Sequence, residues 1–569
     1  MTALVGERTP TLPSSPSVRR LTGPERVWRS LDEPITGRRV PGSVPVGMAA
    51  GVISLVVSLF IARTGFNLAY SDAQSHLTIA RRLLDTKSNP GLAQLGTVWL
   101  PVPHLLLAPL AMSLWLWHTG LAAALLGAGC MAVTAAGLYR AAARWGARRI
   151  GRLAVVGVIV ANPTLLYLSS TALTEPVLIA SMAACLAGLA NVATRRRLSS
   201  PGEIAVFCGI PAALAVLCRY EGWALLLTGA AFVVLVSARR AAGRARSLVW
   251  RSVFTHTLGF AVPPLLAMGW WIGFNWVVFH RPLAFLNGEY SANAQQAGIV
   301  AAGASTRSSL RATLAALDAA VSSSVGPASL ALAAIGLIVV CLSARRRRQL
   351  PFLVTAATSY LFLVLALYTG QAIIWNKAIG SSYIWNNRFG MASILPVALL
   401  AAPASEALPA LARRWAPAAR RSQLAAVLSA ALVAATIGLQ CAWFLQRPLE
   451  RSLVLTEAQE SWVSNAPSRE AATWLRKHYS GGGILMDETI SANAQLPQIG
   501  IPLREFYLKA DGSQFDEAVR NPMAHAQWIW LSSDRADALE PVMSEPAVRS
   551  HYRIAASNGD VTIFVRTDS

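Results

Sequence analysis

The sequence predicts a polytopic α-helical membrane protein of about eleven transmembrane helices, followed by a small C-terminal α/β domain. Composition, the length of the apolar stretches and the distribution of arginine all point to this fold class. Hydrophobic residues make up 54% of the 569 residues and charged residues only 14%, against about 25% charged residues in a soluble domain. This composition excludes a wholly soluble globular protein, and it excludes disorder over most of the chain.

Eleven apolar stretches are candidate spans, because a transmembrane helix needs roughly 20 mainly apolar residues. They cover approximately residues 46–62, 119–139, 151–168, 175–193, 203–217, 223–237, 253–279, 326–343, 351–369, 389–404 and 423–444. The six cysteines all lie within apolar runs and form no CxxC motif, so we expect them to pack as small hydrophobic residues.

The arginines predict the orientation of the chain. Six terminal or inter-helix segments are rich in arginine, namely 8–39, 140–152, 195–197, 239–251, 345–348 and 413–421. Short basic loops stay in the cytoplasm, and with eleven spans all six segments fall on that side. The formal net charge of +22 is then mainly an orientation signal. Binding to nucleic acid, which such a charge would suggest in a soluble protein, is not expected.

A further apolar stretch, 98–117, is predicted not to span the membrane. If it did, every later loop would change sides and the arginine-rich loops would lie outside. Its three prolines and the residues Trp99, Trp115 and Trp117 suit a helix at the outer interface, where tryptophan is enriched. We therefore expect two amphipathic helices, 72–86 and 98–117, in a first outer loop that covers 63–118.

The predicted organisation has three parts. Residues 1–45 are rich in Pro, Ser, Thr and Arg and are predicted to be a disordered cytoplasmic tail. Residues 46–444 form the membrane domain, and an odd number of spans places residues 445–569 outside as an α/β domain. In that domain we expect a helix from Ser468 to Tyr479 with Ser468 as its N-cap, and strands near 484–486, 528–531 and 561–565. The turn at 481–483 lacks the lysine of a phosphate-binding loop.

Acidic residues are rare in the membrane domain. Only eight lie between residues 46 and 444, and six of these fall at the predicted outer ends of helices. Because ionisable groups near a bilayer are costly and tend to be functional, they indicate a site on that side. Asp72 follows the first span directly, and on a helix it shares a face with His76. Alternatively, Ser71 or Asp72 only caps this helix. Arg82 lies near the end of the same predicted helix, where we expect its side chain to contact either a phosphate or solvent.

Three later motifs lie on the same predicted side. Glu175 begins a span, where an acid also favours the helix dipole. Arg219 and Glu221 flank another outer turn and can simply pair with each other. Arg388, preceded by Asn387, opens a late span from outside. A bound phosphate would account for an arginine there, and so would interfacial snorkelling.

In their order and common side, these motifs resemble the GT-C superfamily of integral membrane glycosyltransferases, which use lipid-phosphate sugars. The protein O-mannosyltransferases and the lipid A aminoarabinose transferases are the most similar types. The resemblance covers about 46–404 and rests on Asp72 with the helices after it, 171–176, 219–223 and Arg388. Many relatives carry a second acid in the first loop, but Ala73 and Gln74 follow Asp72 here. A divalent metal is therefore not favoured, and no cofactor is expected.

The resemblance implies an inverting transferase that moves a monosaccharide from a polyprenyl-phosphate donor to a hydroxyl of a glycan, lipid or protein acceptor. It implies Asp72 as the general base. The implied substrate-binding residues are His76, Arg82, Glu175, Arg219, Glu221, Tyr290, Lys377, Asn387 and Arg388. Tyr290 lies in the long loop 280–325, which we expect to act as a lid. The high Ala and Arg content fits a bacterial inner membrane with the site on its periplasmic side.

Other functions stay open at the level of sequence. A transferase of the O-antigen ligase type usually places its large outer loop between late spans, whereas here the polar region follows the last span. A transporter or flippase of lipid-linked sugars should show inverted repeats or acids within spans, whereas these acids collect at helix ends. A sensor would need a cytoplasmic output domain, which the sequence does not show.

Overall fold

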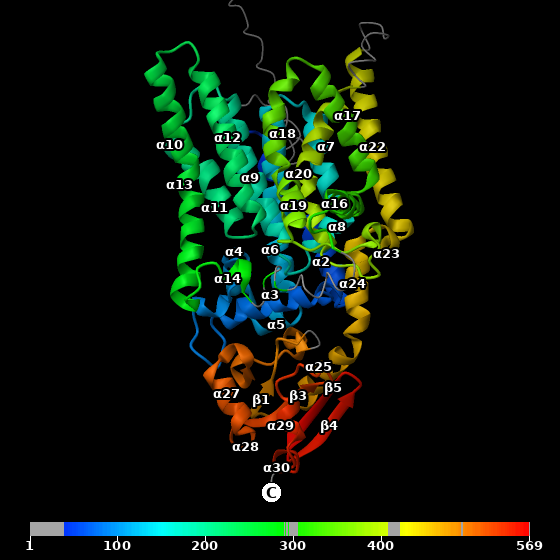
Figure 1. The fold of residues 1–569 in the computed structure, drawn as a ribbon. Coiled ribbons are helices and arrows are strands. Elements are labelled where there is room, and N and C mark those ends of the chain that lie inside the picture. The colour runs from blue at the N-terminus through cyan, green and yellow to red at the C-terminus, as the bar shows by residue number, and fades with distance from the viewer. Residues whose placement is uncertain are drawn as a thin grey trace, which may run out of the picture.

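The computed structural model describes residues 39–288, 305–407, 421–490 and 493–567, together with 291 and 294. It shows a bundle of long helices with an α/β region attached at one end (Figure 1). We call this end of the bundle the sheet-bearing end.

Seven helical segments among the described residues are long and apolar enough to cross a membrane, so the chain is a multi-pass membrane protein. They are α2 (Ser43–Arg63), α6 (Leu121–Arg144), α9 (Glu175–Thr194), α12 (Glu221–Ala241), α13 (Arg246–Phe279), the run η6–α20 (Asn387–Ser405) and α22 (Arg421–Gln446). Two bent pairs raise the number to nine if each counts as one span. One is α16 (Leu310–Val325) with α17 (Pro327–Leu342), and the other joins η4–α18 (Arg346–Ala356) to α19 (Thr358–Thr369).

The predicted count of eleven spans is not confirmed. The stretch 151–168 is broken, because α7 (Arg149–Val160) ends and Asn162 caps a separate short helix, α8 (Pro163–Leu168). The stretch 203–217 lies within a helical run, α10 (Pro201–Ile204), η3 (Ala205–Gly209) and α11 (Ile210–Val216), that is shorter than a full span. The stretch 98–117 forms only α4 (Pro101–Ala111) and α5 (Leu114–His118), and neither is long enough to cross a bilayer.

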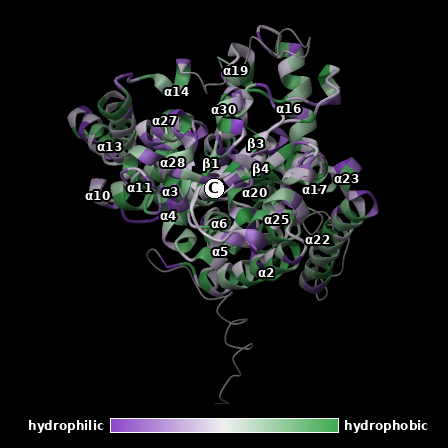
Figure 2. Cartoon of the chain, turned by 90° about the horizontal axis from the view of Figure 1, so that it is seen from below, coloured by the Kyte–Doolittle hydropathy of each residue, from purple (hydrophilic) through white to green (hydrophobic). Residues whose placement is uncertain are grey.

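Burial separates the inner helices from those that face outward. The most buried windows belong to α9, at 72%, and to the run Asn387–Ser405, at 89%. Those of α2, α13 and α22 are each 22% buried, and Figure 2 shows that α2 is largely hydrophobic. Helices that expose apolar side chains around their circumference need a lipid environment. The helices that the bundle encloses are therefore α9 and the run Asn387–Ser405.

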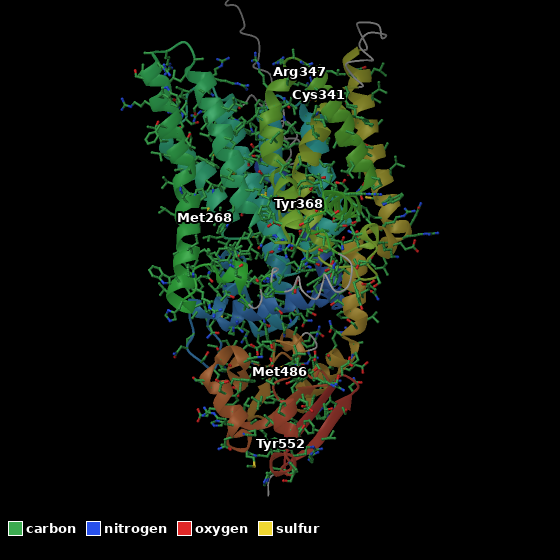
Figure 3. All side chains as sticks on the ribbon, in the orientation of Figure 1. Met268, Cys341, Arg347, Tyr368, Met486 and Tyr552 are labelled. Atoms are coloured by element: carbon green, nitrogen blue, oxygen red, sulfur yellow. The ribbon has the colours of Figure 1, made fainter. Side chains whose placement is uncertain are left out.

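One end of the bundle carries an arginine-rich turn. Arg347, in an arginine-rich turn, lies at the end opposite Met486 and Tyr552 of the α/β region (Figure 3). This separation agrees with the predicted distribution of arginine. The assignment of that end to the cytoplasm stays a prediction, as do the domain boundaries.

The C-terminal region contains a five-stranded sheet of order β2-β1-β3-β5-β4. Its strands are β1 (Gly483–Met486), β2 (Phe506–Leu508), β3 (Ala526–Ser532), β4 (Tyr552–Asn558) and β5 (Val561–Arg566). The pairs of β1 with β2 and β3 are parallel, and the others are antiparallel. The sequence predicted β1, β3 and β5 but missed the other two. The expected N-cap at Ser468 is wrong, because α25 (Ala466–His478) begins earlier and encloses that residue.

The C-terminal region docks on the first amphipathic helix, α3 (Ser71–Arg82), which Figure 1 shows between the bundle and the sheet. Asp85, just beyond α3, accepts hydrogen bonds from the backbone N–H groups of Leu503 and Arg504 at 3.1 and 3.2 Å, and Arg81 donates to it at 2.6 Å. These contacts fix one end of α3, so the position of its other end, which carries Asp72, is determined as well.

The predicted loop 280–325 is not a loop throughout. It contains α14 (Ala284–Asn287), and its second half forms α16, where the hydroxyl of Ser309 accepts a hydrogen bond from the backbone N–H of Ala312 at the start of the helix. Tyr290 and residues 295–304, which the predicted lid also includes, lie outside the described residues.

Close packing of α6 against the loop before α9 gives a prediction about stability. A Cβ atom on Gly127 would overlap the carbonyl oxygen of Ser169, whereas one on Gly129, in the same helix, would meet nothing. Gly127→Ala should therefore lower the free energy of unfolding by about 1–3 kcal/mol, measured by thermal unfolding in detergent. Gly129→Ala is the matched control. Equal stability of the two variants would contradict this packing.

Candidate active site

The candidate site surrounds the buried guanidinium of Arg388, in the 3₁₀ turn η6 (Asn387–Ser393) at the start of a buried span. Its Nη2 atom hydrogen-bonds Oδ2 of Asp72, and its Nη1 atom lies 3.2 Å from Oε1 of Glu457. Its Nε atom lies 3.3 Å from Oε1 of Glu175, an ion pair without hydrogen-bond geometry. Three carboxylates from distant parts of the sequence thus surround one cation.

A second guanidinium, that of Arg219, shares Glu175 with the first. Its Nη1 atom lies 3.0 Å from Oε1 of Glu175 and its Nε atom lies 3.0 Å from Oε1 of Glu221. The ring of Phe389 packs against both cations, with its centroid 4.5 Å from the Arg219 guanidinium and 5.5 Å from that of Arg388. Arg219 and Glu221 pair as one interpretation of the sequence predicted, and Glu175 joins this pair to Arg388.

The local fold explains why Arg388 points into this cluster. Asn386 adopts a left-handed conformation, with φ of 58°, and the next residues enter η6. The side chain of Asn387 donates to the carbonyl oxygens of Trp375 and Trp385, at 2.8 and 3.2 Å, and so holds the bridge between these two residues. Asn387 is fully buried. The structure gives it a role in shaping the turn, which is a different role from the predicted contact with substrate.

Exposure distinguishes Asp72 from the other carboxylates. Its side chain is 37% exposed, whereas those of Glu175, Glu221 and Glu457 are between 2% and 7% exposed. No side chain caps α3, so the alternative that Asp72 or Ser71 serves as its cap is wrong. Asp72 is therefore the one carboxylate of this cluster that an incoming molecule can reach.

Two buried histidines, His76 and His104, form a hydrogen-bonded pair. His76 lies one helical turn after Asp72 on α3. Nδ1 of His76 lies 2.8 Å from Nε2 of His104, and Nδ1 of His104 lies 3.1 Å from the carbonyl oxygen of Leu100. Because a carbonyl only accepts, His104 carries its proton on Nδ1 and accepts at Nε2. His76 then donates from Nδ1 and keeps Nε2 as an acceptor. Burial lowers the pKa of His104 to about 4 and that of His76 well below its usual value, so both rings are neutral.

Comparison with solved structures finds the same overall architecture. ArnT from Cupriavidus metallidurans bound to undecaprenyl phosphate matches with a TM-score of 0.50 at 14% sequence identity, over 90% of this chain and 98% of that one. The chain has the GT-C fold. The apo state of the same ArnT gives a TM-score of 0.46 at 15% identity, over 90% and 97% of the two chains. An oligosaccharyltransferase of Archaeoglobus fulgidus, in complex with zinc and sulfate, gives 0.42 at 13%, over 86% and 68%. No protein-family model and no curated protein matches the sequence.

Within this GT-C fold, other predicted site residues lie away from Arg388. Arg82 donates to the carbonyl oxygen of Gln94 at 2.9 Å and lies 3.5 Å from Oε1 of Glu488, so it joins α3 to the C-terminal region. Lys377 is exposed on the short turn η5 (Lys377–Ile379). Neither residue contributes to the cluster. Across the described ranges, no group of three or more His, Cys, Asp or Glu residues is placed to hold a metal ion.

Sequence reasoning missed Glu457 and His104. Glu457 lies on α24 (Leu453–Ser464), beyond the region that carried the resemblance, and nothing in its neighbourhood in the sequence points to a site. His104 lies in an apolar, proline-rich helix. A signal was present in that helix, because a histidine among apolar residues at an interface needs a hydrogen-bonding partner.

The cluster predicts a structural role for Arg388. Arg388→Met leaves the buried carboxylates of Glu175 and Glu457 with less compensation, and breaking a buried ion pair by removing one partner costs about 3–5 kcal/mol. We expect a lower temperature of thermal unfolding in detergent, and a smaller decrease for Arg388→Lys, which keeps the charge. Lys377→Met, an exposed change in the preceding loop, should leave that temperature unchanged. A stable Arg388→Met protein would contradict this role.

Proposed function

We propose that the chain is a glycosyltransferase that moves a monosaccharide from a polyprenyl-phosphate donor to an acceptor hydroxyl at the outer face of the membrane. The observation that carries the proposal is the ion pair between the exposed carboxylate of Asp72 and the buried guanidinium of Arg388, at one end of a GT-C bundle. The pair places a proton acceptor beside a cation that suits a phosphate.

The structural neighbour supports the class of donor. ArnT, with the same fold over nearly its full length, binds undecaprenyl phosphate. A lipid phosphate needs an apolar surface for its chain and cations for its head group. Arg388 and Arg219 supply the cations, and the weakly buried apolar helices α2, α13 and α22 supply apolar surface on the outside of the bundle. The acceptor class, whether glycan, lipid or protein, stays open.

In the proposed reaction the acceptor oxygen attacks the anomeric carbon while the bond from that carbon to the phosphate oxygen breaks. The phosphate leaves with the electron pair, and the configuration inverts. The acceptor hydroxyl gives its proton to Asp72, which must lie within about 2.6–3.2 Å of it. Asp72 suits this step because it is the reachable carboxylate of the cluster.

Arg388 and Arg219 supply the positive charge for the leaving phosphate. A guanidinium can donate two parallel hydrogen bonds to a phosphate, and a fixed charge aimed at the leaving group stabilises the transition state. As Asp72 takes the proton it becomes neutral and its hold on Arg388 weakens. The guanidinium is then released toward the phosphate at the step in which the phosphate gains charge. His76 offers Nε2 as an acceptor for a sugar or acceptor hydroxyl.

The proposed location is a bacterial inner membrane, with the N-terminus in the cytoplasm and the sheet-bearing end in the periplasm. The separation of arginine-rich turns from the sheet supports this orientation. No metal is assigned to the reaction, since the proposed steps use side chains of the cluster alone.

Asp72→Asn tests the base. Because general-base catalysis contributes about 10²–10⁴-fold to the rate, we expect a loss of that size in the transfer of radiolabelled sugar from a polyprenyl-phosphate donor. The variant should still purify as a folded protein, since Asp72 is partly exposed. Asp516→Asn, an exposed change on α27 (Ser513–Arg520), is the matched control. Transfer at the normal rate by Asp72→Asn would remove Asp72 as the base.

The hydrogen-bonded pair of His76 and His104 gives a separate prediction. His104→Phe removes the acceptor of the His76 Nδ1–H group, so His76 no longer has a fixed tautomer. We expect kcat/KM to fall about tenfold, roughly the value of one hydrogen bond. The comparison is with His478→Phe, an exposed change on α25. An unchanged kcat/KM for His104→Phe would show that the tautomer of His76 does not matter.

A further inference from the structure

Glu457 links the C-terminal helix α24 to the candidate site. Its Oε1 atom accepts a hydrogen bond from Arg388 at 3.2 Å and from the backbone N–H of Asn386 at 3.0 Å. Its Oε2 atom lies 3.3 Å from the backbone nitrogen of Asn387, which donates to it. One carboxylate therefore holds both the side chain of Arg388 and the turn that presents it. Glu457 acts on Arg388 and not on the reacting atoms, so it is a positioning residue.

The cluster contains more negative than positive groups. Among the described residues, Arg219 and Arg388 are the only cationic groups that form ion pairs with the four carboxylates of Asp72, Glu175, Glu221 and Glu457. A lipid phosphate that reaches Arg388 adds further negative charge to a site with little exposure. Uncompensated charge is costly in such a place. A proton taken up by one of the carboxylates would compensate the added charge.

We propose that binding of a lipid phosphate beside Arg388 is coupled to uptake of one proton by the carboxylate of Glu457. With the proton on Glu457, Arg388 loses one anionic partner and can donate to the phosphate. The two backbone hydrogen bonds remain, so the turn keeps its place. The identity of the ligand rests on the proposed function, whereas the proton uptake rests on the contacts of Glu457.

The surroundings of Glu457 support this choice. Burial raises its pKa to about 7, Arg388 and the two backbone N–H groups oppose the rise, and Asp72 adds to it. The other titratable groups that interact with it are the phenols of Tyr70 and Tyr167. Several charged groups on the elements packed against α24 have partners of their own: Asp318 on α16 accepts from Tyr360, Glu450 pairs with Arg447, Arg451 donates to the carbonyl oxygen of Trp443, and Arg469 donates to that of Trp462.

The test is the affinity of the purified full-length chain for undecaprenyl phosphate in detergent, between about pH 6 and about pH 8.5. In Glu457→Gln the side chain is neutral at every pH. The matched control is Glu460→Gln, an exposed change on the same helix. The second ionisation of the phosphate, near pH 6, is common to all proteins, so the ratio of affinities between variant and wild type isolates Glu457.

The pKa of Glu457 determines how the ratio of affinities depends on pH. Below about pH 7 Glu457 already carries its proton, so wild type and Glu457→Gln should bind alike. Above it wild type must take up the proton first, and the ratio should rise about 30-fold in favour of Glu457→Gln by about pH 8.5. Glu460→Gln should follow wild type throughout. A ratio that does not change with pH overturns the proton uptake.

Three further outcomes are informative. If no protein binds the lipid phosphate at any pH, both the proposed function and this inference fail. If inorganic phosphate competes at comparable concentration, the site recognises phosphate without the lipid, and the proton uptake is judged from the same ratio. If Glu457→Gln does not fold, calorimetry of wild type in buffers of different ionisation enthalpy counts the protons directly. Uptake near one proton at about pH 8 supports the inference, and none overturns it.

Discussion

The structure depends on the burial of one guanidinium, that of Arg388, among carboxylates from three separate parts of the chain. Asp72 follows the first span, Glu175 begins α9, and Glu457 comes from α24 after the last span. An unpaired charge in such a place is strongly destabilising, and a paired one restricts the geometry of its partners. The guanidinium of Arg388 therefore restrains the relative positions of the three helices that carry these carboxylates.

The C-terminal region contributes to this geometry from two sides. Through Asp85 and Arg82 it holds the far end of α3, whose first turn carries Asp72. Through α24 it supplies Glu457 and two contacts with the start of α3: Ser461 donates to the carbonyl oxygen of Ala69, and Asn465 donates to the hydroxyl of Ser71. The sheet itself contributes no residue to the cluster. The loops and helices of this region stabilise the position of α3, so that the partly exposed carboxylate of Asp72 stays beside the buried cation.

The sequence was sufficient to predict a helical membrane protein, the three central strands, and the meeting of Asp72, Glu175 and Arg388 at one end. Those acids stand out because acidic residues are rare in the membrane domain, and that arginine stands out because it lies on the side away from the arginine-rich segments. Glu457 was not predictable in the same way, because in a polar segment one glutamate among many carries no signal. The span count differed because length and hydropathy do not show where a helix breaks, as at Asn162. Lys377 and Arg82 carry the expected charge, but the direction of a long side chain depends on its tertiary partners.

The three edges of the Arg388 guanidinium are not equivalent, and this constrains the order of events. Nη1 faces Glu457 and Nε faces Glu175, and both of these carboxylates are buried. Only Nη2 faces a partly exposed group, Asp72. In the proposed reaction, a phosphate that approaches from outside therefore meets the guanidinium at the edge that Asp72 occupies, and it competes with the residue proposed as the base. The proposed base and the proposed phosphate ligand are the two partners of one ion pair. In that reaction Asp72 becomes neutral as it takes up the hydroxyl proton, so the Nη2 edge of Arg388 is freed for the phosphate at the step in which the phosphate gains charge.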